Sequence, residues 1–396
     1  MDPKRNPFAP GAGAPPPELA GRDDVIERAA VALYRIGSGR AARSMVLYGL
    51  RGVGKTVVLQ RIRLASEQQG VVPVSIEAPE DRSLPASLGP ALRAALIRMS
   101  KAQAAKKALK KGLGALASFV RAAKVKYGDV ELNIDFDSDP GVADSGDLEA
   151  DLTDLLTAIG ESAAERKTVV ALFIDELQYI PEEQLAALIT ALHRASQRQL
   201  PITLVAAGLP QLLGQMGRAK SYAERLFEFV PLGPLDAASA RQALCVPAEH
   251  EGVQFTDAAV DEILARTQGY PYFLQEWGRH AWSEADHSPI TLVDARRANE
   301  VALAELDASF FRVRFDRLTQ GEKQYLRAMA ELGAGPHRSG DIATLLGKKI
   351  SAVAPIRARL IGKGMIYSPS HGDTAFTVPL FDGFMRRIMP AFAVSS

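Results

Sequence analysis

The most constraining feature of the sequence is a glycine-rich segment that lies between an apolar run and a helical pattern. Residues 49–56 read Gly-Leu-Arg-Gly-Val-Gly-Lys-Thr and match the pattern G-x-x-x-x-G-K-[ST] in full. The apolar run Ser44–Tyr48 precedes them and a helical pattern from Lys55 to Gln69 follows, which predicts a strand, a loop and a helix. Glycines let main-chain N–H groups curl around a phosphate, and the helix N-terminus adds its positive dipole end. The segment therefore predicts a phosphate-binding loop.

A second element pairs an apolar strand with two carboxylates. The run Val169–Ile174 ends in Asp175 and Glu176, and the C-terminal edge of an open α/β sheet is where ligands bind. We expect Lys55 to contact the β- and γ-phosphates, and Thr56 and Asp175 to hold Mg²⁺. Glu176 is the candidate group that orients or deprotonates the water attacking the γ-phosphate. The alternative is that both carboxylates only mark the exposed end of a strand.

Further apolar runs alternate with helical stretches. They lie at Val71–Ile76, Thr168–Ile174 and Pro201–Ala206, and Phe227–Val230 is a candidate fifth strand. Runs that are apolar throughout are typical of parallel strands buried on both faces. The sequence therefore predicts an α/β fold in which helices cover both faces of a mostly parallel sheet.

About ninety residues more than a normal crossover separate the second and third runs, which indicates an insertion at about residues 79–150. Its first part, Ser100–Lys126, is rich in Ala and Lys. Alternation at Val125–Tyr127 and again from Val130 to Phe136 predicts a hairpin. The insertion is either a solvated helix and hairpin or a basic surface for nucleic acid or anionic lipid.

Composition shifts divide the rest of the chain. Residues 1–17 are dense in Pro, Gly and Ala and predict an extended arm. We expect the α/β domain at 18–234, a helical domain at 235–309, with Thr256 and Thr291 as N-caps, and a third domain at 310–396. The third domain combines three helical patterns with two short β-like runs, which predicts a winged helix-turn-helix. These patterns lie at Gly321–Leu332, Ser339–Leu346, Ser351–Lys363, Met365–Ser368 and Thr374–Val378.

Composition excludes several classes of protein. The chain has 47 Lys and Arg against 46 Asp and Glu, so any basic surface is local. Its single cysteine, Cys245, excludes an internal disulfide framework and a multi-thiolate zinc site. No run reaches the roughly 20 apolar residues of a membrane span, and the histidines show no spacing that predicts a metal cluster. We expect a cytoplasmic protein without membrane insertion.

Several motifs together resemble one family. Residues 49–56 and the Asp175–Glu176 pair resemble the Walker A and Walker B motifs of P-loop ATPases. Gly21-Arg22-Asp23 resembles the box that precedes the P-loop in archaeal-type origin-recognition initiator ATPases of the AAA+ class and in STAND ATPases, and Gly269-Tyr-Pro271 resembles the Gly-x-Pro motif of the STAND lid. The resemblance covers residues 18–396 and implies a P-loop NTPase sheet, a helical lid, a C-terminal winged helix, ATP or ADP, and Mg²⁺. The residues it assigns to the nucleotide are Arg22, Gly49, Leu50, Arg51, Gly52, Val53, Gly54, Lys55, Thr56, Val57 and Pro271.

The resemblance also bears on catalysis. Arg225 lies just before the fifth strand, where such families carry an arginine that senses the γ-phosphate of a neighbouring subunit, which implies self-assembly. The alternative is a surface arginine paired with Glu224 or Glu228. The fourth strand ends at Ala207–Gly208 without the polar sensor residue of the initiators, and the lid lacks their arginine near Pro271. These departures imply slow hydrolysis and a switch rather than a motor.

Positive charge is concentrated at the C-terminal end of the chain. Within residues 310–396, cations exceed anions by about seven, which favours double-stranded DNA as a partner. Ser351–Lys363 is the candidate recognition helix. The alternative is a winged helix that contacts a protein partner, as in a STAND-like signalling ATPase. The candidate DNA contacts are Arg338, Lys348, Lys349, Arg357, Arg359, Lys363 and His371.

Overall fold

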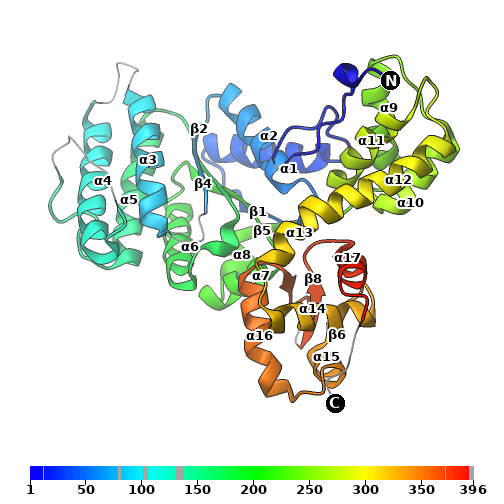
Figure 1. Cartoon of the computed structure of the whole chain (residues 1–396). Helices are drawn as coiled ribbons and strands as arrows, with labels where there is room; N and C mark the ends of the chain where they lie inside the picture. The colour runs from blue at the N-terminus through cyan, green and yellow to red at the C-terminus, as the bar shows by residue number, and fades with distance from the viewer. Residues whose placement is uncertain (12, 79–81, 101–105, 131–137, 371, 392–396) are drawn as a thin grey trace. The chain divides into compact units, whose positions relative to one another are not determined.

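A computed structural model describes residues 1–11, 13–78, 82–100, 106–130, 138–370 and 372–391. The chain divides into two compact units (Figure 1). Unit A consists of residues Arg22–Tyr48 and Lys55–Pro231, and unit B of Met1–Gly21, Gly49–Gly54 and Leu232–Ser396. Within the described residues, none of the helices combines the length and the apolar character that a bilayer crossing requires.

Unit A is built on a five-stranded parallel sheet, which confirms the predicted fold class. The strand order is β2-β3-β4-β1-β5. All residues of β3 and β4 are buried, as expected for central parallel strands covered on both faces. The strands are β1 (Ser44–Tyr48), β2 (Val72–Glu77), β3 (Val170–Asp175), β4 (Ile202–Gly208) and β5 (Phe227–Pro231).

The strand order decides which face each helix covers. The chain crosses the sheet in one direction from β1 to β2 and in the other from β2 through β3 and β4 to β5. Since parallel crossovers are right-handed, α2 lies on the face opposite to α5 and α6 (Figure 1). Arg22 is the N-cap of α1, and Asp23 and Asp24 lie in its first turn. These helices are α1 (Asp23–Gly37), α2 (Lys55–Gln68), α5 (Leu148–Glu165), α6 (Glu182–Gln197), α7 (Gln211–Ala219) and α8 (Ala223–Leu226).

The segment between β2 and β3 is largely helical. It contains α3 (Leu84–Ser100) and α4 (Lys106–Tyr127), and α4 packs between α3 and α5. The prediction of a strand at Val125–Tyr127 is wrong, because these residues complete α4. Alternation over three residues does not distinguish a strand from a helix end, and the buried side chains of Leu116, Phe119 and Ala123 continue at helical spacing to Tyr127. The other predicted strand falls largely within residues 131–137, outside the described residues.

Unit B begins with the N-terminal segment and four helices. The N-caps Thr256 and Thr291 are confirmed, since each side chain accepts a main-chain N–H of its helix. The N-terminal segment has a short 3-10 helix at Pro3–Arg5 and packs on the helices, where Phe8 is buried and Trp282 Nε1 donates to the Asp2 carbonyl at 3.0 Å. The four helices are α9 (Ala237–His250), α10 (Asp257–Thr267), α11 (Pro271–Glu284) and α12 (Leu292–Leu306).

The C-terminal part of unit B contains the three predicted helices and the two predicted strands. A π-helical turn, η3 (Asp307–Phe311), and α13 (Arg312–Asp316) continue directly from α12. The sheet is antiparallel with the order β6-β8-β7, so it has one strand more than the sequence predicted. Buried side chains of this part and of α9–α12 form one hydrophobic core. Its elements are α14 (Gln320–Leu332), β6 (His337–Arg338), α15 (Ser339–Leu345), α16 (Ile350–Gly362), β7 (Ile366–Tyr367), β8 (Asp373–Phe376) and α17 (Phe381–Ile388).

A buried carboxylate joins α14 to α16. The Glu322 side chain is fully buried, and it accepts hydrogen bonds from Lys363 Nζ and from the Thr319 main-chain N–H, both at 2.8 Å. Arg359 Nε lies 3.6 Å from the other carboxylate oxygen. Burial alone would raise the pKa of Glu322, but the bonds from Lys363 and Thr319 outweigh it and lower the pKa. Ionised Glu322 therefore stabilises this region.

We predict that Glu322→Gln loosens α14 and α16 at neutral pH. Peptides from both helices should exchange amide hydrogens about fivefold faster than wild type at pH 7, equivalent to about 1 kcal/mol. A lowered pKa contributes stability above the unfolded value of about 4.3 that is lost as pH falls through the folded value, so the difference should shrink as pH falls below about 4. The control is Glu300→Gln, an exposed position on α12. Unchanged exchange at pH 7 would contradict this role for Glu322.

Candidate phosphate and magnesium site

The glycine-rich segment forms the loop that connects β1 to α2. Gly52 and Gly54 have φ values of +84° and +87°, a left-handed conformation that glycine adopts without a steric penalty. The chain then enters α2, whose first residues are Lys55, Thr56 and Val57. Main-chain N–H groups at a helix N-terminus have no partner within the helix and favour an anion. The predicted strand, loop and helix are therefore confirmed.

Other loop residues form contacts within unit B. The Gly52 carbonyl accepts the Tyr272 main-chain N–H at 3.1 Å, and the Arg51 N–H donates to the Thr377 carbonyl at 3.0 Å. Pro271 occupies the first position of α11, directly before Tyr272. Gly49 and Val53 are buried, Leu50 is half-buried, and Arg22 is buried at the start of α1.

Lys55 and Thr56 both interact with Asp175, which ends β3. The Thr56 hydroxyl donates to Asp175 Oδ2 at 2.6 Å, although the two residues are 119 positions apart. Lys55 is only 7% exposed, and its charge acts to lower the pKa of Asp175. A buried ammonium requires anionic neighbours. The structure therefore brings together the three side chains that the sequence assigned to phosphate and metal.

The electrostatics of Asp175 favour a cation. Burial is the largest influence and raises the pKa of Asp175, and the charge of Glu176 acts in the same direction. Hydrogen bonds from the Thr56 hydroxyl and the Glu176 N–H and the charge of Lys55 oppose the rise without cancelling it. Magnesium prefers oxygen ligands, and Asp175 and Thr56 supply two oxygens at hydrogen-bonding distance from each other. These residues fit a magnesium ion.

Glu176 follows in an unusual conformation. Its φ and ψ are 51° and 38°, in the left-handed region that non-glycine residues rarely adopt. Such conformations persist where surrounding contacts determine them, and they are concentrated at functional sites. The Glu176 carboxylate accepts a hydrogen bond from Gln178 Nε2. Sequence reasoning missed Gln178, and the available signal was one amide side chain within the apolar turn Leu177–Ile180.

Arg225 lies exposed in α8, immediately before β5. Glu228, one of its two expected partners, pairs instead with Arg28, with Nη1 at 3.1 Å from Oε1. Among the described residues, no carboxylate forms an ion pair with Arg225.

The candidate DNA-binding cations differ in how strongly they are held within the C-terminal region. Arg357 donates to the Thr374 and Ser368 side chains and to the Asp373 carbonyl, at 2.8–3.0 Å. Arg359 and Lys363 both face Glu322, and Arg338 Nε lies 3.7 Å from an Asp373 oxygen. Within the described part of the chain, Lys348 and Lys349, just before α16, are exposed and form no ion pair. His371 lies outside the described residues.

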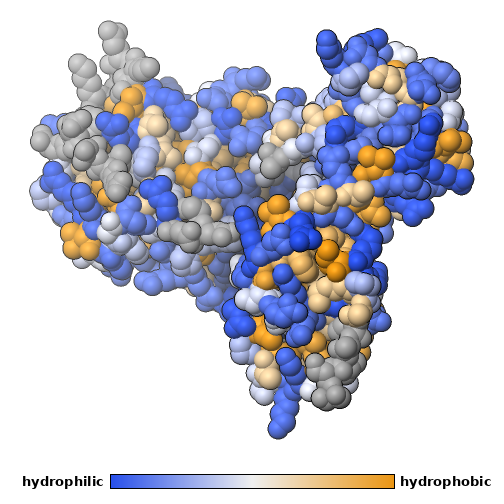
Figure 2. All heavy atoms as spheres, viewed as in Figure 1, coloured by the Kyte–Doolittle hydropathy of each residue, from blue (hydrophilic) through white to orange (hydrophobic). Residues whose placement is uncertain are grey.

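The exposed face of α16 is largely apolar and small. Ala352, Ala354, Pro355 and Ala358 are exposed, and Ile350 at its N-terminus is 59% exposed. On the face drawn in Figure 2, hydrophobic side chains are visible among hydrophilic ones over the C-terminal region. The candidate DNA-binding cations that are exposed and form no ion pair in the described part of this region, Lys348 and Lys349, therefore lie just before the N-terminal end of the predicted recognition helix.

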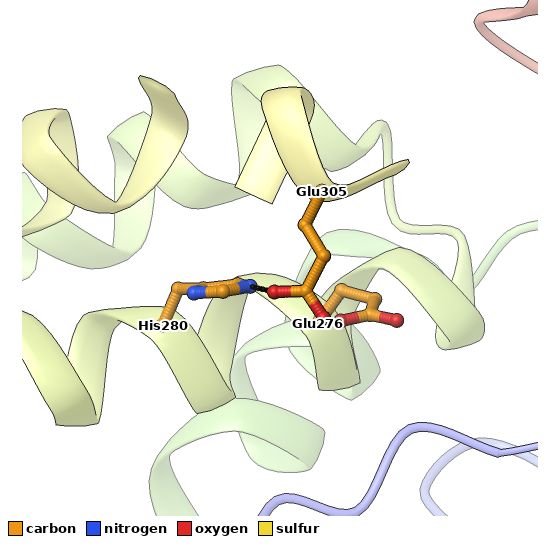
Figure 3. Close-up of side chains that lie close together, drawn as sticks. All are labelled: Glu276, His280 and Glu305. Atoms are coloured by element: carbon orange, nitrogen blue, oxygen red, sulfur yellow. Dashed lines mark ion pairs between the residues drawn. The ribbon is translucent and has the colours of Figure 1, made fainter. Parts of the chain in front are cut away.

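Three titratable side chains converge between α11 and α12 (Figure 3). Glu276, His280 and Glu305 have ligand atoms within 4.8 Å of one another, a cluster that the sequence analysis did not predict. Arg279 Nη2 lies 3.1 Å from Glu276, 2.8 Å from Glu305 and 2.9 Å from His280 Nε2. Burial and then Arg279 lower the pKa of His280. Because Arg279 already neutralises part of the carboxylate charge, we assign the cluster a structural role.

Comparisons with known proteins agree with this geometry. The sequence model of the AAA ATPase domain family matches residues 18–205, and that of a domain of unknown function, DUF8462, matches residues 308–385. A search of curated proteins returns no match.

Three solved structures that match most of the chain are the following. The Walker-type ATPase PABY2304 of Pyrococcus abyssi has 15% identity and a TM-score of 0.54, over 93% of this chain and 96% of that chain. The Orc1 protein of Aeropyrum pernix, solved in complex with DNA, has 17% identity and a TM-score of 0.46, over 94% of both chains. The RuvB Holliday junction branch migration motor of Thermotoga maritima has 17% identity and a TM-score of 0.44, over 90% and 92%.

The first of these similarities supports the fold, while the family match covers the phosphate-binding loop and both carboxylates. Residues 18–205, which include the phosphate-binding loop, Asp175 and Glu176, are therefore similar to AAA ATPase domains.

Proposed function

We propose that this protein binds ATP with Mg²⁺ and hydrolyses it slowly, and that the nucleotide state controls the helical lid and the winged helix as a switch. The observation that carries the proposal is the 2.6 Å hydrogen bond between Thr56 and Asp175, beside the buried Lys55. These groups match the parts that P-loop ATPases use for the metal and the phosphates. We place this activity in the cytoplasm, because a chain with the single cysteine Cys245 forms no internal disulfide.

Each side chain has a defined chemical task in this proposal. Thr56 and Asp175 hold Mg²⁺, which neutralises charge that develops on the phosphates. Lys55 and the main-chain N–H groups of the loop bind the phosphate oxygens. Glu176 orients the attacking water and accepts its proton. β4 ends in Gly208 and so lacks the polar sensor residue that the initiator ATPases carry at the end of this strand. This absence supports slow turnover.

The position of Arg225 supports a role for self-assembly of the chain in ATP hydrolysis. It is exposed and lacks an ion pair among the described residues, so its guanidinium is accessible to a second copy of the chain. A fixed cation delivered to the γ-phosphate stabilises the transition state of phosphoryl transfer. We therefore expect the rate of ATP hydrolysis per chain to rise with protein concentration.

The partner we propose for the winged helix is double-stranded DNA. Lys348 and Lys349 are exposed at the N-terminal end of α16, the end of a recognition helix that reaches base edges in helix-turn-helix complexes. The excess of cations in residues 310–396 favours a polyanion. Arg357 shapes the wing, and Arg359 and Lys363 remain near the surface beside Glu322.

A second candidate is a STAND-like signalling ATPase whose winged helix contacts a protein. The exposed small apolar residues of α16 favour it, because DNA-docking helices carry polar side chains on that face. The bond from Arg51 N–H to the Thr377 carbonyl also favours it, because it engages one loop amide with the C-terminal region.

Two substitutions separate ATP binding from turnover. Lys55→Ala should weaken ATP binding at least about 100-fold, because it removes the phosphate ammonium. Glu176→Gln should retain binding within about twofold and lose turnover about 100-fold or more, because the amide cannot accept a proton. Titration calorimetry and phosphate release measure the two effects, and thermal unfolding controls for folding. Equal turnover by wild type and Glu176→Gln would remove Glu176 from its role.

Charge reversal at α16 distinguishes the two candidate partners. The full chain with Lys348→Glu and Lys349→Glu should lose DNA affinity at low salt, and its dependence of log K on log salt should become shallower by about two. The control makes the same charge change at two exposed arginines outside residues 310–396, Arg40→Glu and Arg296→Glu. No retention of wild-type protein on DNA at low salt, or equal loss in both variants, would favour the protein-binding candidate.

A further inference from the structure

Gln178 lies in the short turn that follows the two carboxylates. It belongs to η2 (Leu177–Tyr179), a 3-10 turn whose N-cap is Glu176, and it is 8% exposed. A buried amide side chain has both a donor and an acceptor to satisfy. Gln178 satisfies both within the site, since its Nε2 donates to Glu176 Oε2 and its Oε1 accepts the Leu209 main-chain N–H at 2.9 Å.

These two bonds join the end of β3 to the end of β4. Leu209 directly follows Gly208, the last residue of β4. A Cβ at position 208 would lie 2.8 Å from Gln178 Oε1 and 2.7 Å from Leu212, so only glycine leaves room for the amide. β4 itself ends without a polar side chain. In the structure, the Gln178 amide oxygen reaches the end of β4 from the turn after β3, and there it accepts the Leu209 N–H.

The same contacts bear on the orientation of Glu176. Its left-handed backbone is costly for a residue with a side chain, so the surrounding bonds have to hold it in place. The Glu176 N–H donates to Asp175 Oδ1 at 2.8 Å, and the Glu176 carboxylate is bound by Gln178. Main chain and side chain of Glu176 are thus fixed from two sides. A neutral amide orients a carboxylate without adding a charge.

We propose that Gln178 is a positioning residue that aims the Glu176 carboxylate at the attacking water and couples it to the loop after β4 through Leu209. This inference rests on the proposed function and extends it to a residue that touches neither phosphate nor metal. Movement of the Leu209 main chain would shift the Gln178 amide and, with it, the carboxylate. Misplacement of a reacting group by about 1 Å costs about 100-fold in rate.

The experiment compares hydrolysis of Mg²⁺-ATP by the full chain and three variants. Gln178→Leu removes both bonds at similar volume, and kcat should fall at least about tenfold while KM and ATP affinity stay within about twofold. Gln184→Leu is the matched control, because Gln184 is also 8% exposed and its Oε1 also accepts a main-chain N–H, that of Leu84, away from the carboxylates. It should lose stability and retain kcat within about twofold.

Gln178→Glu adds a test that a structural role would not affect. It keeps an acceptor for the Leu209 N–H but places a second carboxyl beside Glu176, and two such groups share a proton. At low pH one carboxyl keeps a proton and donates it to the other, which replaces the bond from the Gln178 amide to Glu176. At high pH this proton is lost. The turnover of this variant relative to wild type should therefore fall as pH rises through the range in which the shared proton is lost, while Gln184→Leu follows the wild-type profile.

The outcomes separate the two proposals. Absence of ATP binding or turnover in wild type overturns the proposed function, and this inference with it. Turnover in wild type with Gln178→Leu at or above wild-type kcat, or a Gln178→Glu profile parallel to wild type, overturns the inference alone. If Gln178→Leu fails to fold, the pH profile of Gln178→Glu decides.

Discussion

The hydrogen bond between Thr56 and Asp175 is the interaction on which the proposed chemistry depends. It ties the first turn of α2 to the end of β3, because the strand order brings these ends to one edge of the sheet. Burial raises the pKa of Asp175, so its protonated form favours the folded state and its ionised form becomes a cost as pH rises through that pKa. A bound divalent cation relieves this cost. The ionised Asp175 carboxylate thus lowers the stability of the unliganded protein, and a bound cation restores it.

The sequence was informative where one residue type alone satisfies a local requirement. Gly52 and Gly54 in left-handed conformations, and a lysine and a threonine opening a helix, leave few alternatives to a phosphate-binding loop. The wholly apolar β3 and β4 predicted a buried parallel sheet for the same reason. Short patterns were ambiguous, and Val125–Tyr127 formed the end of a helix because tertiary packing of α4 decided its structure.

Contacts between residues distant in sequence were not predictable. Nothing in the pattern pairs Gln178 with Leu209, since that contact requires β3 and β4 to be neighbours and Gly208 to leave space. The same limit applies to charge. A count of cations in residues 310–396 does not reveal that the buried Glu322 faces Arg359 and Lys363. The paired cations join α14 to the C-terminal end of α16, and the exposed lysines before α16 carry the DNA proposal.

The central claim is tested most directly by titration calorimetry of the wild-type chain with ATP, with Mg²⁺ and with the metal chelated, alongside Asp175→Asn. The account predicts that Mg²⁺ tightens ATP binding at least about tenfold in wild type, because the Asp175 carboxylate and the Thr56 hydroxyl face the metal. Asp175→Asn should lose most of that gain while its thermal stability without ligand rises. Binding of equal strength with and without Mg²⁺, or no binding, would contradict the account.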